Sequence, residues 1–261
     1  MTTLRLVQVD AFADRPFAGN PAAVMPLDEW LDDATLQAIA LENNLSETAF
    51  TVSATDGEAD YELRWFTPTT EVAMCGHATL AAGHVLIGDR ECVRFRTRQA
   101  GVLEVAREGE GYAMSLPAWT PAPKPMPEIV AALGCAPVET LWHPSRTGLV
   151  AVASEAEVHA LAPDLKALAA SGDLLTIVTA PGSATDVVSR VFAPGAGIDE
   201  DPVTGSAHAV LVPYWAARTG RSRFTFHQAS RRGGHLAGRL DGERVILGGT
   251  CVTVIEGEMR F

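Results

Sequence analysis

CGHATLAAGHVL, at residues 75–86, is the stretch from which we predict the fold. It consists almost wholly of small and apolar residues, and a helix with so little polar surface, expected over 76–88, should be buried. DPVTGSAHAVLVPYWAAR, at residues 201–218, has the same character and predicts a second buried helix from about Pro202. Proline lacks the amide hydrogen that a helix interior uses, so Pro213 should kink or locally break this second helix. We expect each helix to be the centre of one half of the chain.

The segments that precede the two helices repeat. FTP at 66–68 stands before Cys75, and FAP at 192–194 stands before Asp201 at the same spacing. The helix starts at Cys75 and Asp201 are therefore equivalent positions, about half a chain apart. Such a self-similarity at a fixed separation is the mark of an internal duplication.

A further match and a connector agree with this duplication. FRTRQA at 95–100 is echoed by FTFHQA at 224–229, in the same order. Between the halves lies PAWTPAPKPMP at 117–127, whose prolines exclude regular helix and favour an extended connector. We therefore expect an N-terminal half over 1–116 and a C-terminal half over 117–249.

Each half is predicted to mix strands with helices. Alternating apolar residues favour strands, and Asp32 or Asp33 can cap a helix through about Asn43 that buries one apolar face. The predicted strands cover 4–9, 45–52, 61–66, 93–97, 101–106 and 112–116, then 147–153, 174–179, 187–193, 223–227, 244–248 and 251–255.

Composition limits the classes of partner. The chain has 261 residues, of which 47% are hydrophobic and 20% charged, so it can bury an ordinary globular core. Its formal net charge of −12 argues against a nucleic-acid or anionic-membrane surface, since both need basic patches. A small anionic metabolite needs only local positive potential and stays a candidate partner.

The cysteines and the absence of known motifs exclude several kinds of site. Cys75, Cys92, Cys135 and Cys251 are scattered without a CxxC pair, which predicts neither a zinc site nor a disulfide framework and fits a reducing compartment. No histidine pair has the HExxH arrangement, and neither a P-loop nor a complete dinucleotide fingerprint is present, so we predict no metal site. With no leader-like or membrane-length apolar run, a cytoplasmic protein is expected.

The two helix starts are candidate anion sites. Helix N-termini carry unpaired backbone N–H groups and partial positive charge, so groups near Gly76 and near Gly205 and Ser206 could hold a carboxylate. Related by pseudo-symmetry, they could face each other across a cleft between the halves. The simpler interpretation of Asp201-Pro202 is a helix N-cap followed by the first helical residue.

Three side chains could carry proton chemistry. Glu47 has apolar neighbours in its predicted strand, which makes its ionisation costly and suits a general acid or base; the alternative is a strand-end glutamate turned to solvent. His77, in the first helical turn, is either a polar capping group or a proton carrier. Cys75 is either a buried small side chain or, at a helix N-terminus, a thiol of lowered pKa.

Five motifs resemble those of the PhzF-like family, named for phenazine biosynthesis. They occur in the family's order and cover essentially the whole chain. The motifs are DAF at 10–12 with FAGNPAAV at 17–24, NLSETAF at 44–50, CGHAT at 75–79, DPVTGSA at 201–207 and QASRRGG at 228–234.

The resemblance implies the fold. It is the diaminopimelate-epimerase-like α/β (α+β) fold, in which each of two pseudo-symmetric halves is a curved, mainly antiparallel sheet wrapped round a central helix. Residues 250–261 would return to the N-terminal half. Members of the family are usually homodimers that need no cofactor.

The resemblance also implies an activity. PhzF-like proteins of the phenazine pathway use a glutamate to shift a proton within trans-2,3-dihydro-3-hydroxyanthranilate, which implies a cofactor-independent isomerase acting on a carboxylate-bearing substrate in the interdomain cleft. By motif, Glu47 is the proton shuttle, with His77 and Asp201 assisting. The residues that would contact substrate are Asn20, Cys75, Gly76, Gly205 and Ser206.

Two other functions remain open. Epimerases of this fold use two cysteines, one at each helix start, whereas this chain has Cys75 at the first position and Asp201 at the second. A two-thiol racemase is therefore not expected, but an amino-acid or hydroxy-acid epimerase using Cys75 and Asp201 is an alternative. A non-catalytic metabolite-binding protein of the same fold is the other.

Overall fold

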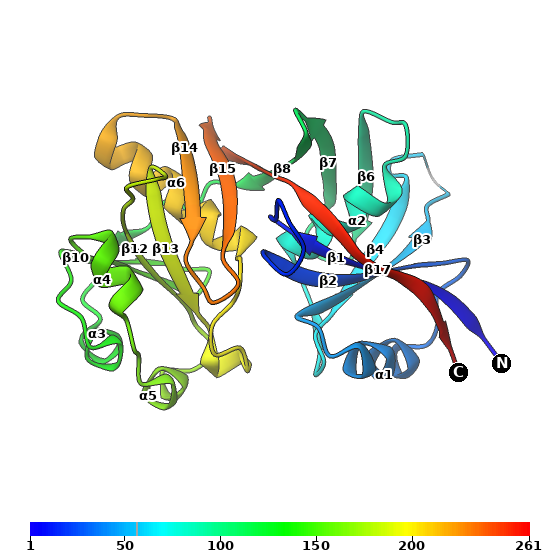
Figure 1. Cartoon of the computed structure of the whole chain (residues 1–261), viewed down its shortest axis with the longest axis horizontal. Helices are drawn as coiled ribbons and strands as arrows, with labels where there is room; N and C mark the ends of the chain where they lie inside the picture. Colours follow the sequence, from blue (N-terminus) through cyan, green and yellow to red (C-terminus); the bar gives the residue numbers. More distant parts are fainter. Residues whose placement is uncertain (56) are drawn as a thin grey trace. The chain divides into compact units, whose positions relative to one another are not determined.

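The computed structural model describes residues 1–55 and 57–261. Contacts between Cα atoms divide the chain into two compact units, one of Met1–Ser115 with Gly248–Phe261 and one of Leu116–Leu247. Both are mixed α/β units in which strands outnumber helices, as the sequence predicted for the fold class (Figure 1).

The first unit is a mainly antiparallel sheet around one buried helix. β17 pairs with β1, and from β1 the neighbours follow as β2, β3, β4, β6, β7 and β8, with parallel pairing at β2–β3 and β4–β6. Its strands are β1 (Thr3–Ala11), β2 (Asn20–Leu27), β3 (Glu47–Ser53), β4 (Tyr61–Phe66), β5 (Glu71–Val72), β6 (Cys92–Thr97), β7 (Val102–Glu108), β8 (Gly111–Pro117) and β17 (Cys251–Arg260). Its helices are α1 (Asp33–Asn43) and α2 (Gly76–Leu86).

The second unit repeats this topology. From β10 to β15, each strand pairs with the next, and the pairings are in turn antiparallel, parallel, antiparallel, parallel and antiparallel. The strands β1, β2, β3, β4, β6 and β7 of the first unit pair in the same sequence of directions. Its strands are β9 (Ala122–Pro123), β10 (Glu139–His143), β11 (Thr147–Ala151), β12 (Leu175–Pro181), β13 (Val187–Phe192), β14 (Arg223–Gln228), β15 (Gly234–Asp241) and β16 (Arg244–Gly249). Its helices are α3 (Pro127–Leu133), α4 (Glu155–Ala160), α5 (Leu165–Ala170), the 3₁₀ turn η1 (Pro194–Ala196) and α6 (Gly205–Thr219).

The central helices α2 and α6 occupy equivalent places, as the sequence repeat predicted. Helix α2 contacts β1, β2, β3, β6, β7 and β17, and helix α6 contacts β14 and β15. Nearly every residue of α2 from Gly76 to Gly83 is buried, as its lack of polar side chains required. Among residues 1–55 and 57–261, no helix combines the length and the apolar composition needed to cross a membrane.

The start of α6 differs from the prediction. The helix begins at Gly205 with Thr204 as its N-cap, so the expectation that Asp201 caps it and Pro202 is its first residue is wrong. The cause is Gln228 on β14, whose side-chain oxygen accepts the Thr204 N–H at 2.9 Å and whose amide donates to the Asp201 carbonyl at 2.8 Å. These bonds hold residues 201–204 outside the helix.

Pro213 does not break α6, contrary to one of the two expected outcomes. The helix runs through it to Thr219. A proline cannot donate to the carbonyl four residues before it, and that carbonyl, of Ala209, instead accepts the backbone N–H of Trp119 at 2.8 Å. The segment that begins the second unit is thereby fastened to the middle of its central helix.

Candidate functional site

Four of the residues singled out from the sequence lie together in the first unit. Asn20 and Glu47 are the first residues of β2 and β3, and the parallel register that pairs Ala22 with Glu47 brings the two strand starts to the same edge. Cys75 is the N-cap of α2 and His77 lies in its first turn. We call Asn20, Glu47, Cys75 and His77 the His77 centre.

Glu47 and His77 form the core of this centre. Oε2 of Glu47 lies 3.1 Å from Nε2 of His77, and the two residues are 9% and 4% exposed. The strand-end glutamate is therefore not turned to solvent. The two atoms are close enough for an ion pair but are not aligned for a hydrogen bond, and neither has another hydrogen-bond partner within the described chain. A buried carboxylate and imidazole with unused hydrogen-bonding capacity can act on a bound molecule.

The other ring nitrogen of His77 faces a thiol and an amide. Nδ1 lies 3.4 Å from Sγ of Cys75 and 3.3 Å from Nδ2 of Asn20. The amide of Asn20 is oriented in turn by Ser46, whose hydroxyl donates to Oδ1 at 2.9 Å. Because an amide nitrogen donates, Nδ1 of the neutral ring must accept, which leaves the ring proton on Nε2 beside Glu47.

The surroundings shift two pKa values in this centre. Burial raises the pKa of the Cys75 thiol, and the neighbouring carboxylate of Glu47 raises it further. Burial alone would lower the pKa of His77, but attraction to the acidic groups of Cys75 and Glu47 outweighs this and raises it well above the ordinary value. Of the two interpretations of Cys75, the buried small side chain fits this environment and the thiol of lowered pKa does not, because α2 begins in a dry interior where a second negative charge is disfavoured.

Glu47, Cys75 and His77 also have the composition of a metal site, with ligand atoms within 4.8 Å of one another. Their shortest contacts do not converge on one atom of the ring. The thiol faces Nδ1 of His77 whereas the carboxylate faces Nε2, and a single ion can bind only one nitrogen of a ring. The geometry instead suits proton exchange through the imidazole.

The start of α2 borders the same centre. Gly76 is its first residue and is buried, and the helix has no side-chain cap among the described residues. Backbone N–H groups of a first helical turn lack helical partners and carry partial positive charge. They can attract an anionic group beside Glu47 and His77.

The remaining predicted residues belong to the second unit. Asp201 precedes α6, and its carboxylate accepts a hydrogen bond from the hydroxyl of the N-cap Thr204. Gly205 and Ser206 form the first turn of α6, where no side-chain cap exists within the described chain. This helix start therefore resembles that of α2 in having first-turn N–H groups without a side-chain partner.

Two residues of the sites were not assigned a role from the sequence. Ser46 orients Asn20, and Gln228, fully buried, fixes the loop that carries Asp201. Both lie within motifs quoted for the family resemblance, at 44–50 and 228–234. The sequence alone does not show that the Ser46 hydroxyl points at Asn20, because that contact depends on how β3 lies beside β2.

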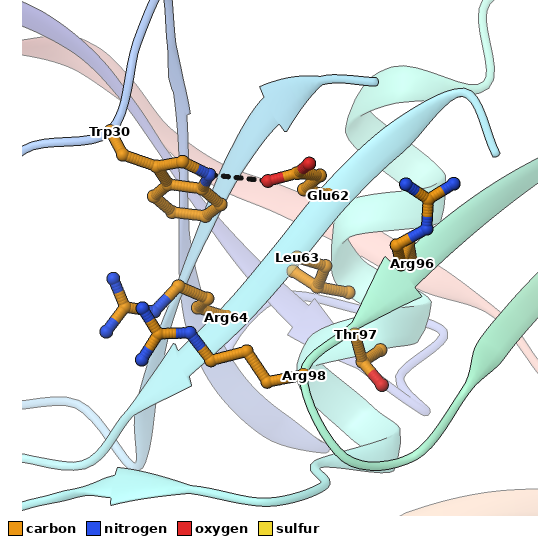
Figure 2. A pocket seen from close by; sticks show the side chains of 7 residues that line it. All are labelled: Trp30, Glu62, Leu63, Arg64, Arg96, Thr97 and Arg98. Carbon is orange, nitrogen blue, oxygen red and sulfur yellow. Dashed lines mark hydrogen bonds between the residues drawn. The ribbon is translucent and has the colours of Figure 1, made fainter. Parts of the chain in front are cut away.

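A pocket of about 280 Å³ in the first unit is separate from the His77 centre, and Figure 2 shows its lining. Three arginines line it, and carboxylates bind two of them closely. Arg64 is bound by Glu71 and Asp33, each at 2.8 Å, and Arg98 by Glu71 at 3.0 Å. The Trp30 indole donates to Glu62 at 2.6 Å, as the dashed line shows. These ion pairs stabilise the outer face of β4 and leave little positive charge for a ligand.

Comparison with known proteins places the chain. The family model described as "Phenazine biosynthesis-like protein" matches residues 9–257. An uncharacterized isomerase of Pseudomonas aeruginosa is 50% identical, with 99% of each chain covered. The crystal structure of a PhzF-family phenazine biosynthesis protein from Enterococcus faecalis matches with a TM-score of 0.93 at 43% identity, over 100% of both chains.

A more distant structure shows how far the fold extends. A hydroxyproline epimerase from Agrobacterium vitis matches with a TM-score of 0.63 over 98% of this chain and 92% of its own. At 11% identity this likeness concerns the fold alone. It agrees with the epimerase-like architecture that the sequence resemblance implied.

Proposed function

The chain belongs to the phenazine biosynthesis-like protein family, and on that premise we propose that it is an isomerase that moves a proton within a small carboxylate-bearing substrate. The observation that carries the proposal is the buried pair of Glu47 and His77, 3.1 Å apart at the start of the central helix. Relatives at 50% identity bear the name isomerase, which supports the reaction class.

Glu47 is the proposed proton shuttle. Its carboxylate takes a proton from a substrate carbon, so a C–H bond breaks, an O–H bond forms, and the electron pair spreads into the adjoining conjugated system. The resulting carboxylic acid returns a proton to a second carbon of the same molecule. No electron leaves the substrate, so this proposed reaction needs neither an oxidant nor a cofactor. Burial of Glu47 supports the role, because exclusion of water protects the intermediate from side reactions.

His77 is the proposed partner of this shuttle. With its proton on Nε2, the neutral ring presents a donor beside the carboxylate, and its raised pKa lets it carry a second proton near neutral pH. Asn20 and Ser46 position the ring through Nδ1. Their proposed contribution is to keep Nε2 beside the Glu47 carboxylate throughout the proton shift.

We extend the proposal to the substrate's carboxylate. N–H groups around Gly76 are proposed to attract it. The N–H groups of Gly205 and Ser206 are proposed as a second anion-attracting point, within the other unit, and Asp201 as a group that binds a donor of the substrate there. The support in each unit is a helix start that has no side-chain cap within the described residues. Backbone groups would let an acidic protein bind an anion.

An epimerase that uses Cys75 and Asp201 is less well supported. A thiol base must be ionised to take a proton, and burial together with Glu47 raises the pKa of Cys75. Epimerases of the same fold at 11% identity do not carry a mechanism to this chain. The remaining alternative, binding without turnover, is an outcome of the experiment below.

The test is solvent exchange in D₂O, followed by NMR. Trans-2,3-dihydro-3-hydroxyanthranilate and a panel of unsaturated and amino carboxylic acids are the probes. The wild-type chain should build deuterium into a turned-over probe, and Glu47→Gln should lose at least about 100-fold in rate, the usual contribution of a positioned acid or base. Glu42→Gln, at an exposed carboxylate of α1, is the matched control and should keep the wild-type rate.

Exchange that persists in Glu47→Gln with unchanged folding would remove Glu47 from the reaction. Stereoinversion abolished by Cys75→Ser but not by Glu47→Gln would favour the epimerase. Saturable binding of a probe with no exchange in the wild type would favour the non-catalytic function.

A further inference from the structure

A second group of metal-ligating side chains lies in the second unit, outside the proposed catalytic residues. Glu155 and His159 stand one turn apart on α4, and His227 projects from β14. One ligand atom from each lies within 4.8 Å of the other two, and Oε1 of Glu155 is 3.5 Å from Nε2 of His159. We call these three residues the His159 cluster.

One carboxylate oxygen of Glu155 is fixed by hydrogen bonds, and the other faces the histidine. Its Oε2 accepts both the backbone N–H and the hydroxyl of Ser183, at 2.8 and 2.6 Å. Its Oε1 is directed at His159. Hydrogen bonds to the outer oxygen of a carboxylate are the usual means by which proteins orient a metal-binding carboxylate.

His227 is held by a stacked ring and by a closely approaching loop. Its ring stacks on that of His235, its cross-strand partner on β15, with centroids 4.7 Å apart and planes 13° apart. Gly233 has a φ of +66°, and a Cβ at that position would lie 3.4 Å from Nε2 of His227. The backbone of the loop therefore lies close to Nε2, and the glycine adds no side chain there.

We propose that Glu155, His159 and His227 bind one divalent transition-metal ion, with zinc as the first choice. Two imidazole nitrogens and a carboxylate oxygen are borderline ligands that suit Zn²⁺, Ni²⁺ or Cu²⁺ and not Mg²⁺ or Ca²⁺, which prefer oxygen alone. A water molecule would complete a tetrahedron. The ion would tie α4 to β14, so its role is structural and independent of the proposed isomerase.

The sequence predicted no metal site because no HExxH arrangement is present. These ligands escape such a search because His227 is distant in the chain from the Glu155-x-x-x-His159 pair, and only the folded sheet brings them together. The cluster is also unlike the His77 centre, where the thiol and the carboxylate face different nitrogens of one ring.

The test is a calorimetric titration of the full chain, free of any polyhistidine tag, with ZnCl₂, and with MgCl₂ as the negative probe. One Zn²⁺ per chain should bind, and His159→Ala and His227→Ala should each weaken binding at least tenfold. His143→Ala, which removes a histidine elsewhere in the second unit, should bind as the wild type does. Because His159 is 49% exposed in its side chain, its variant should fold even if the His227 variant does not.

The absorption spectrum of the Co²⁺-substituted chain identifies the ligands. Bands of tetrahedral cobalt without a thiolate-to-metal charge-transfer band are expected, and they should disappear in His159→Ala. Zinc binding of equal strength in the wild type and His159→Ala, a thiolate band, or no zinc binding by the wild type would each overturn the proposal.

Discussion

At the scale of single residues, the site depends on how a ring is oriented. His77 has two nitrogens with different neighbours, and the contacts at Nδ1 decide which nitrogen presents a proton to Glu47. Ser46 acts one step away, through Asn20. A hydroxyl that touches neither Glu47 nor His77 is therefore expected to influence the proposed reaction.

Ser46→Ala should lower kcat by about tenfold with little change in KM, because losing one orienting hydrogen bond is worth about 1 kcal/mol. Loosening the Asn20 amide also removes a donor that favours the neutral ring. The pKa of His77, already raised, should rise further, and the limb of the pH–rate profile that reports it should move to higher pH.

Ser46→Thr keeps the hydroxyl and is the matched control, with activity close to wild type. A loss of activity in Ser46→Ala without any movement of the pH limb would mean that Ser46 only stabilises the fold.

At the scale of elements, the positions of the central helices were predictable and their first residues only partly so. The small and apolar composition of residues 75–86 predicts a buried helix, and α2 is buried and begins at Gly76 as expected. In α6 the local signal of Asp201-Pro202 is outweighed by Gln228, a residue on another strand that fixes the loop from a distance. Local capping preferences are too small to resist such tertiary bonds.

Several strands escaped prediction for similar reasons. β2, β10 and β15 lack clean alternation, and β2 even contains prolines at 21 and 26. These segments are stabilised as strands by pairing with their neighbours in the sheet rather than by their own strand propensity. In the site, Glu47, Cys75 and His77 could be singled out as residue types, but the sign of the thiol's pKa shift required knowledge of its burial.

Gln228→Ala should lower the free energy of unfolding by about 2–3 kcal/mol, because it leaves buried polar groups of Asp201 and Thr204 without partners. Urea denaturation followed by far-ultraviolet circular dichroism measures this. Gln99→Ala, at the repeat-equivalent glutamine, is the matched control and should change stability by less than about 0.5 kcal/mol, since Gln99 is exposed. Equal stability of Gln228→Ala and wild type would show that residues 201–204 keep their conformation without the hydrogen bonds of Gln228.

At the scale of the whole molecule, one buried histidine in α6 links stability to pH. Nδ1 of His208 donates to the Thr204 carbonyl at 2.8 Å, its ring is fully buried, and burial lowers its pKa to about 4. The ordinary pKa of 6.5 applies once the chain unfolds, so between pH 6.5 and 4 the unfolded state binds more protons.

The stability contributed by His208 is therefore complete above pH 6.5 and is lost as the pH falls towards 4, by an amount of about 3 kcal/mol. Urea denaturation at a series of pH values should show His208→Gln losing less stability than the wild type across this window. His77 contributes with the opposite sign in both chains, because its pKa is raised. Parallel pH curves for the two chains would contradict the assignment.

β17 pairs with β1, from Arg260 opposite Thr3 to Cys251 opposite Ala11 (red and dark blue in Figure 1). This pairing of the two chain ends affects the order in which the two units can fold during translation. The nascent chain exposes β1 early, but translation must pass through the whole of Leu116–Leu247 before β17 leaves the exit tunnel. The second unit is a continuous segment and can collapse during synthesis. The first unit must wait with an unpaired edge on β1, so it is the unit whose strands are more exposed to aggregation during synthesis.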